Sequence, residues 1–146
     1  MCDLILVTLI QLILTWVLVG VTWFSQIIHY PLYMKIKEGF VDYERSHIRR
    51  TALLVGPIML AEAVSAVFLM GFAPPGIIAH LATSNLILLI VIWLATFLFQ
   101  ISLHQKLSVR FSKKILHGLI ACNWIRTVLT TLKGCVMAAL VYFLLM

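Results

Sequence analysis

Charged residues are scarce in this chain. Only 11% of its 146 residues are Asp, Glu, Lys or Arg, whereas 63% are hydrophobic. A soluble domain averages about 25% charged and about 45–50% apolar residues. A globule of this length cannot bury so much apolar surface, so much of that surface must face lipid. The length allows one domain, residues 1–146.

Acidic residues are scarcer than basic ones. Five Asp and Glu stand against eleven Lys and Arg, which gives a net charge of +6. The positive charge falls almost entirely in two short connecting segments, where membrane topology explains it. No basic stripe with interleaved aromatic residues lies outside the apolar segments, so we expect no nucleic-acid partner.

The cysteines and the common short motifs indicate no functional site. The three cysteines form no CxxC pair, and the chain has no HExxH sequence and no Cys-His cluster. On one helix, Cys122 and Cys135 would lie about 20 Å apart, too far for a disulfide. The N-terminal MCDLILVTLI lacks both a positive region and an A-x-A site, so we expect a retained transmembrane helix rather than a signal peptide.

Four long apolar runs are present. They cover residues of about 4–28, 52–72, 79–103 and 119–146, and each reaches the roughly 20 residues that cross a bilayer core. In lipid the backbone hydrogen bonds must close within each segment, so the runs predict helices. The expected fold is an all-α integral membrane four-helix bundle.

A short amphipathic stretch separates the first two runs. Its apolar and polar residues recur at spacings of three and four, which predicts an interfacial helix at about 38–50. The residues on its inward face are Phe40, Tyr43, Glu44, His47 and Arg50.

The connections predict the orientation. The second connection, FAPPG, carries no charge, whereas the first and third are basic. Because positively charged loops stay in the cytoplasm, we expect the two basic connections there and both termini outside. The basic residues are Lys35, Lys37, Arg45, Arg49 and Arg50 in the first connection, and Lys106, Arg110, Lys113 and Lys114 in the third.

Polar side chains recur on one face of three helices. At 100° per residue, each set falls within a narrow arc near the cytoplasmic end of its helix. Because polar residues in lipid usually face the bundle interior, the three faces predict a shared pocket in the cytoplasmic half. The sets are Thr22, Gln26 and His29, followed by Tyr33; Trp93, Thr96, Gln100 and His104; and Asn123, Arg126, Thr127 and Thr130.

The second helix contributes one charged group, Glu62, near its middle. A lone ionised carboxylate at that depth is very unfavourable, so it should be protonated, paired or bound to a cation. Lys133 lies at nearly the same depth, and Arg126 can reach inward from the cytoplasmic edge. The sequence therefore predicts that Glu62 pairs with one of these two residues.

The predicted pocket suggests roles for its residues. His29, His104 and Glu62 are the candidate catalytic groups, since imidazoles and a buried carboxyl can move protons. The same three residues with His47 are candidate metal ligands, because imidazole and carboxylate bind iron, copper or zinc and imidazole ligates haem. The alternative is that these histidines only bond to backbone or headgroups. The candidate substrate-binding residues are Gln26, Tyr33, Gln100, Asn123 and Arg126, of which the last two would hold an oxyanion or carbonyl.

Four blocks carry a family resemblance: WFSQIIHYPLY, GFVDYERSHIRR, GPIMLAE and NWIRT. Together they resemble an uncharacterised family of small four-helix bacterial membrane proteins, and this resemblance implies a location in the bacterial inner membrane. In size, helix count and the Asn-x-x-Arg element, the chain is also similar to anthrone-oxygenase-like membrane proteins, and more loosely to four-helix membrane protoporphyrinogen oxidases. Leu32 stands where the latter family has an arginine. These resemblances imply oxidoreductase chemistry on a lipophilic substrate, and no catalytic residue is carried over from them.

The sequence is compatible with three alternative functions. The first is an enzyme, redox or metal-assisted, that acts on a small lipophilic substrate from the bilayer. The second is a non-catalytic accessory subunit of a membrane complex, whose polar groups only join helices. The third is a small transporter, which would need a homo-oligomer and polar residues through the whole membrane depth. The outer half offers only Thr8, Gln11, Thr15, Thr83, Ser84 and Asn85 for that purpose.

Overall fold

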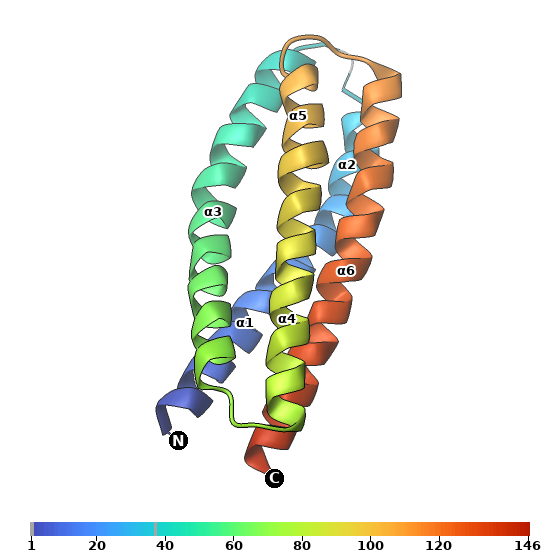
Figure 1. Cartoon of the computed structure of the whole chain (residues 1–146). Helices are drawn as coiled ribbons and strands as arrows, with labels where there is room; N and C mark the ends of the chain where they lie inside the picture. The colour runs from blue at the N-terminus through green and yellow to red at the C-terminus, as the bar shows by residue number, and fades with distance from the viewer. Residues whose placement is uncertain (1, 37) are drawn as a thin grey trace.

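The chain folds as four long helices that form one bundle (Figure 1). The computed structural model describes residues 2–36 and 38–146, so the predicted basic residue Lys37 lies outside the described residues. Each helix contains a stretch long and apolar enough to cross a membrane: Asp3–Tyr33, Phe40–Phe72, Ile77–Leu107 and Lys113–Leu145, of 31, 33, 31 and 33 residues. The predicted all-α four-helix bundle is confirmed, and its four apolar helices are those of an integral membrane protein.

The first helix runs further than its apolar segment. It consists of α1 (Cys2–Phe24), the π-helical turn η1 (Ser25–His29) and α2 (Tyr30–Tyr33). We expected it to end at about residue 28, and Pro31 would ordinarily stop a helix there, because proline has no N–H and its ring crowds the carbonyl of the preceding turn. The wider π turn directly before Pro31 relieves this conflict, so the helix continues.

The second helix, α3 (Phe40–Phe72), is continuous. The segment 38–50, expected as a separate interfacial helix, instead supplies its first turns from Phe40 onward. No helix-breaking residue separates Arg50 from Ala52, so the backbone hydrogen bonds continue from one segment into the other. Gly39, with φ of 69°, lies just before the helix and takes a left-handed conformation that glycine adopts at little cost.

The second half of the chain repeats this plan. It consists of α4 (Ile77–Ala95), a second π turn η2 (Thr96–Gln100), α5 (Ile101–Leu107) and α6 (Lys113–Leu145). Figure 1 shows both termini and the turn between α3 and α4 at one end of the bundle, hereafter the turn end. The connections from α2 to α3 and from α5 to α6 lie at the other end, hereafter the basic end.

Helix α6 packs against α1 and α4, and α3 packs mainly against α1. Close approach of α1 and α6 depends on Gly134, because a Cβ at that position would lie 3.3 Å from the Trp16 ring. Two apolar clusters occupy the ends of the interior. One includes Tyr30, Tyr33, Phe40, Leu107, Leu116 and Leu119 at the basic end, and the other includes Leu69, Ala82, Met137 and Leu140 at the turn end.

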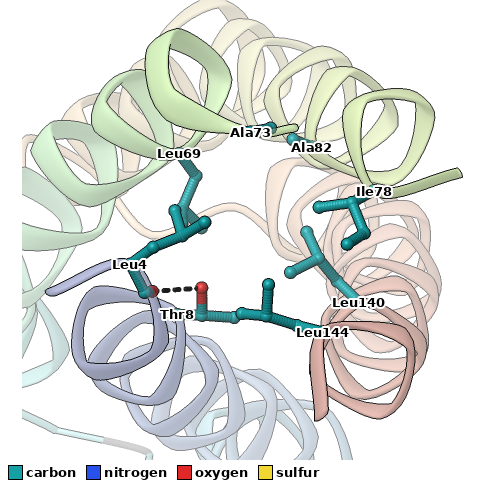
Figure 2. A pocket seen from close by; sticks show the side chains of 8 residues that line it. All are labelled: Leu4, Thr8, Leu69, Ala73, Ile78, Ala82, Leu140 and Leu144. Carbon is teal, nitrogen blue, oxygen red and sulfur yellow. Dashed lines mark hydrogen bonds between the residues drawn. The ribbon is translucent and has the colours of Figure 1, made fainter. Parts of the chain in front are cut away.

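The apolar space at the turn end is not lined by side chains that could take part in a reaction. Figure 2 shows the side chains that surround it, which are aliphatic except for Thr8. The Thr8 hydroxyl donates to the Leu4 carbonyl at 2.7 Å, so its hydrogen-bonding capacity is used within its own helix. The enclosed space is too small for a water molecule. The side chains able to act chemically therefore lie between this space and the basic end.

Candidate functional site

A buried ion pair occupies the middle of the bundle. The Lys133 Nζ of α6 lies 2.6 Å from the Glu62 Oε1 of α3, and both side chains are almost fully buried. The Thr15 hydroxyl of α1 donates to the same carboxylate oxygen at 2.7 Å and accepts from Lys133 Nζ at 2.9 Å. The prediction that Glu62 pairs with Lys133 or Arg126 is confirmed, and Lys133 is the partner.

A second polar cluster forms a hydrogen-bonded chain at the basic end. Glu44 of α3 is fully buried, and its Oε1 lies 2.5 Å from His104 Nδ1 of α5. The other imidazole nitrogen, Nε2, lies 3.3 Å from the Tyr30 hydroxyl. Gln100 Nε2 in turn donates to the Tyr30 oxygen at 2.7 Å. We call these four residues the proton chain.

Each hydrogen bond of the proton chain is donated in the direction of Glu44. A carboxylate only accepts hydrogen bonds, so Glu44 accepts from the Nδ1–H of His104, and this leaves Nε2 of a neutral imidazole as an acceptor. Nε2 then accepts from the Tyr30 O–H, while the Tyr30 oxygen accepts from Gln100. The network itself assigns this tautomer. His104 retains 13% side-chain exposure, so one member of the chain reaches the surface.

The two π turns set the positions of this chain. Each follows a regular helix and carries a buried glutamine, Gln26 in η1 and Gln100 in η2. One turn beyond each glutamine stand Tyr30 and His104, the two rings that meet across the bundle. A π turn rotates the residues after it relative to a regular helix, and such turns occur often at functional sites.

A stack of aromatic rings lies beside the proton chain. The His29 and His47 rings are 4.5 Å apart with an angle of 27° between their planes. Tyr33 meets His29 edge-on at 4.5 Å, and His47 lies 5.4 Å from the His104 ring. Among the described atoms, His29 Nε2 and the Tyr33 hydroxyl are buried without a hydrogen-bond partner. The histidines therefore do gather at the basic end, as their depth predicted.

The predicted metal-ligand set is not assembled. Glu62 pairs with Lys133, whereas His29, His47 and His104 lie with Glu44. Stacked imidazoles hold their ring nitrogens in nearly parallel planes, which does not direct two lone pairs at one ion. Among the described residues, no group of three or more His, Cys, Asp or Glu side chains is placed to hold a metal ion. The structure therefore places Glu62 apart from the three histidines.

Asn123 joins α6 to α1 rather than facing open space. Its Nδ2 donates to Gln26 Oε1 at 2.8 Å, and Thr127 bonds back to the Asn123 carbonyl at 2.8 Å. All three side chains are buried. Asn123 and Gln26 therefore lie on the predicted interior face, but they use part of their hydrogen-bonding capacity on each other.

A small cavity lies between this network and the ion pair. Its volume is about 20 Å³, close to the room that one water molecule or one ligand oxygen needs. Arg126 lines it, together with Glu62, Lys133 and Trp93. Neither of the two ion pairs among the described residues includes Arg126. The remaining lining residues are Leu18, Thr22, Met59, Ile92, Thr96 and Thr130.

The structure thus divides the predicted pocket into two groups. His104, Gln100 and Tyr33 lie at the basic end with His29, whereas Glu62 and Arg126 lie deeper around the cavity. The sequence pattern placed Glu44 on an inward helix face without a role, and it predicted Tyr30 only as an interface residue. The signal for Tyr30 was spacing: Thr22, Gln26 and Tyr30 stand at intervals of four, as do Thr96, Gln100 and His104.

Comparison of the chain with protein-family models, curated proteins and solved structures found no match.

Proposed function

We propose that this protein is an integral membrane enzyme that removes a proton from a small lipophilic substrate near the basic end of the bundle. The observation that carries the proposal is the proton chain, in which Glu44 orients His104 and His104 accepts from Tyr30. A carboxylate, an imidazole and an activated hydroxyl in this order form the usual arrangement for general base catalysis.

The order of the hydrogen bonds gives each residue a role. Tyr30 takes a proton from the substrate as its own hydroxyl proton passes to His104 Nε2. The imidazolium that forms is stabilised by the Glu44 carboxylate next to Nδ1. His104 then loses the proton to water, because part of its ring is exposed at the basic end. The substrate is left as an anion, so no other reactant is needed for this step.

The proposed orientation follows from charge. The exposed basic residues lie at the basic end, and they include Lys35, Arg45, Arg110, Lys113 and Lys114. By the positive-inside rule, this end faces the cytoplasm of a bacterial inner membrane and both termini face outward. His104 then exchanges protons with the cytoplasm. The redox chemistry implied by the family resemblance stays a prediction, and it would add an electron acceptor to the same proton transfer.

Replacing His104 by alanine tests the proposal. Membranes that contain the wild-type protein or His104→Ala are incubated in D2O, and their lipid extracts are compared by high-resolution mass spectrometry. A proton-abstracting enzyme incorporates deuterium into its substrate. Because general base catalysis contributes about 100- to 10,000-fold, we expect at least one lipid-soluble compound to label about 100-fold more slowly with the variant.

His117→Ala is the matched control, since His117 is exposed on α6 and outside the proton chain. It should label the same compound at the wild-type rate. Identical extracts from wild-type and His104→Ala membranes, with both proteins folded and equally abundant, would contradict the proposed enzyme.

Transmembrane proton transfer is a second candidate function, and buried polar groups in the outer half favour it. Gln11 of α1 and Asn85 of α4 are fully buried, and none of their four amide nitrogen and oxygen atoms has a described partner. With Thr15, Glu62 and Lys133 in the middle, polar side chains extend through most of the bundle. Buried amides without partners require water or another polar group.

Proton flux into vesicles separates the two functions. Purified protein is reconstituted with a pH-sensitive dye, and an imposed pH gradient is followed with time. A proton pathway gives flux above that of empty vesicles, and the double variant Gln11→Leu, Asn85→Leu removes it without changing deuterium incorporation. Flux equal to that of empty vesicles would contradict transmembrane proton transfer.

A further inference from the structure

Arg126 is a cation without a counterpart in the interior of the bundle. It is partly buried on α6, and the only two ion pairs among the described residues are Glu44 with His104 and Glu62 with Lys133. An arginine presents five N–H donors and no acceptor. Within a helix bundle in lipid, such a group needs an acceptor. The side chain therefore indicates a missing partner.

The cavity beside Arg126 is lined by more cations than carboxylates. Trp93 lines it from α4, and its indole Nε1–H is buried without a described partner. Glu62 also lines the cavity, but its Oε1 already accepts from both Lys133 and Thr15. The charged groups around the cavity are two cations and one carboxylate. The surplus positive charge and the unpaired N–H groups both favour an oxygen that carries negative charge.

We infer that Arg126 and Trp93 hold the oxygen of a lipophilic carboxylate, enolate or ketone. The cavity volume of about 20 Å³ admits a single oxygen rather than a whole molecule. The rest of the ligand lies outside this space, toward the hydrocarbon around the bundle, and is therefore apolar. A charge-assisted hydrogen bond from the guanidinium is stronger to a carboxylate or enolate oxygen than to a ketone oxygen.

This inference rests on the proposed function, and it names the class of substrate. Thr96, which lines the cavity with Arg126, stands one turn before Gln100, and Gln100 donates to the Tyr30 oxygen. An oxygen held by Arg126 would therefore lie near the hydroxyl that takes the substrate proton. Removal of a proton beside a carbonyl creates an enolate, and a fixed guanidinium stabilises the charge that develops on its oxygen.

Three probes of similar size test the site. Octanoate carries a carboxylate, 2-nonanone carries a ketone, and nonane carries no oxygen. Binding to the purified protein is followed by its thermal unfolding in detergent, since a ligand that binds only the folded state raises the unfolding temperature. We expect octanoate to stabilise most, 2-nonanone less, and nonane not at all. Replacing chloride by gluconate in the buffer distinguishes a resident chloride ion from an organic oxygen.

Two substitutions locate the binding. Arg126→Gln should weaken octanoate binding at least 100-fold, and Trp93→Phe, which keeps an aromatic ring but loses the N–H, about tenfold. Arg110→Gln and Trp124→Phe are matched controls, because both residues are exposed and neither lines the cavity. If Arg126→Gln does not fold, Trp93→Phe and Arg126→Lys carry the test.

Equal stabilisation by octanoate and nonane, or octanoate binding that neither substitution weakens, overturns the inference. An unfolding temperature that depends on chloride alone overturns it as well, because the site would then hold an inorganic ion. These outcomes are independent of the deuterium experiment. A protein that binds octanoate through Arg126 but labels no compound retains the ligand site and loses the proposed enzyme.

Discussion

Lys133→Met will destabilise the protein by about 3–5 kcal/mol, because it leaves the Glu62 carboxylate buried without its cation. Lys133 Nζ lies 2.6 Å from Glu62 Oε1, and the Thr15 hydroxyl bonds to both groups. The substitution therefore removes contacts that join α1, α3 and α6. A single hydroxyl cannot replace an ammonium group as the partner of a buried carboxylate. Denaturant titration in mixed micelles, followed by tryptophan fluorescence, measures the loss.

The double variant Glu62→Gln, Lys133→Met should recover most of that stability. It removes both charges, and replacing a buried ion pair by neutral groups of similar volume is often neutral or stabilising. Lys114→Met is the matched control, because Lys114 is exposed at the basic end. A double variant as unstable as Lys133→Met alone would mean that packing rather than charge pairing sets the cost.

Glu44→Gln will slow the proposed deuterium incorporation by about 100- to 1,000-fold, within the range of general base catalysis. A glutamine amide at this position can donate to His104 Nδ1, which favours the tautomer with the proton on Nε2. His104 could then no longer accept from Tyr30. The apparent affinity for substrate should stay unchanged, because Glu44 lies behind the imidazole and does not line the cavity.

Nitrogen NMR of His104 measures which ring nitrogen carries the proton. A purely structural role of Glu44 would leave this tautomer unchanged. The wild-type imidazole should carry its proton on Nδ1, and the Glu44→Gln imidazole on Nε2. Glu38→Gln is the control, since Glu38 is exposed in the connection before α3. An unchanged tautomer together with an unchanged labelling rate would remove Glu44 from the mechanism.

The membrane-spanning plan of the fold was predictable from local sequence. Four apolar runs and the period of 3.6 identified the helices and their inward faces, and Gln26, Gln100 and Asn123 are buried as expected. Depth alone also led to Glu62 and Lys133, because lipid makes an isolated charge so costly that few partners remain. The helix ends were less predictable, since the thickness of the bilayer limits the length of the apolar run but not the length of the helix.

The contacts at the basic end were not predictable in this way. Outside the lipid core, water can satisfy a polar group, so depth no longer restricts the choice of partner. His29 and His104 belonged to equivalent faces in the sequence, yet His104 bonds to Glu44 and Tyr30 while His29 stacks on His47. His29 is the last residue of η1, whereas His104 lies one turn beyond η2, and no propensity scale predicts such turns.

The sequence by itself determined that the chain forms four apolar helices, that their polar stripes face inward, and that Glu62 needs a buried cation. Each of these follows from the cost of exposing a charge or a backbone group to hydrocarbon. Only the tertiary structure decided which side chains meet, because helix rotation and neighbour order come from packing. In that structure Lys133 pairs with Glu62 and Glu44 pairs with His104. Arg126 lies beside a cavity and outside both ion pairs of the described residues.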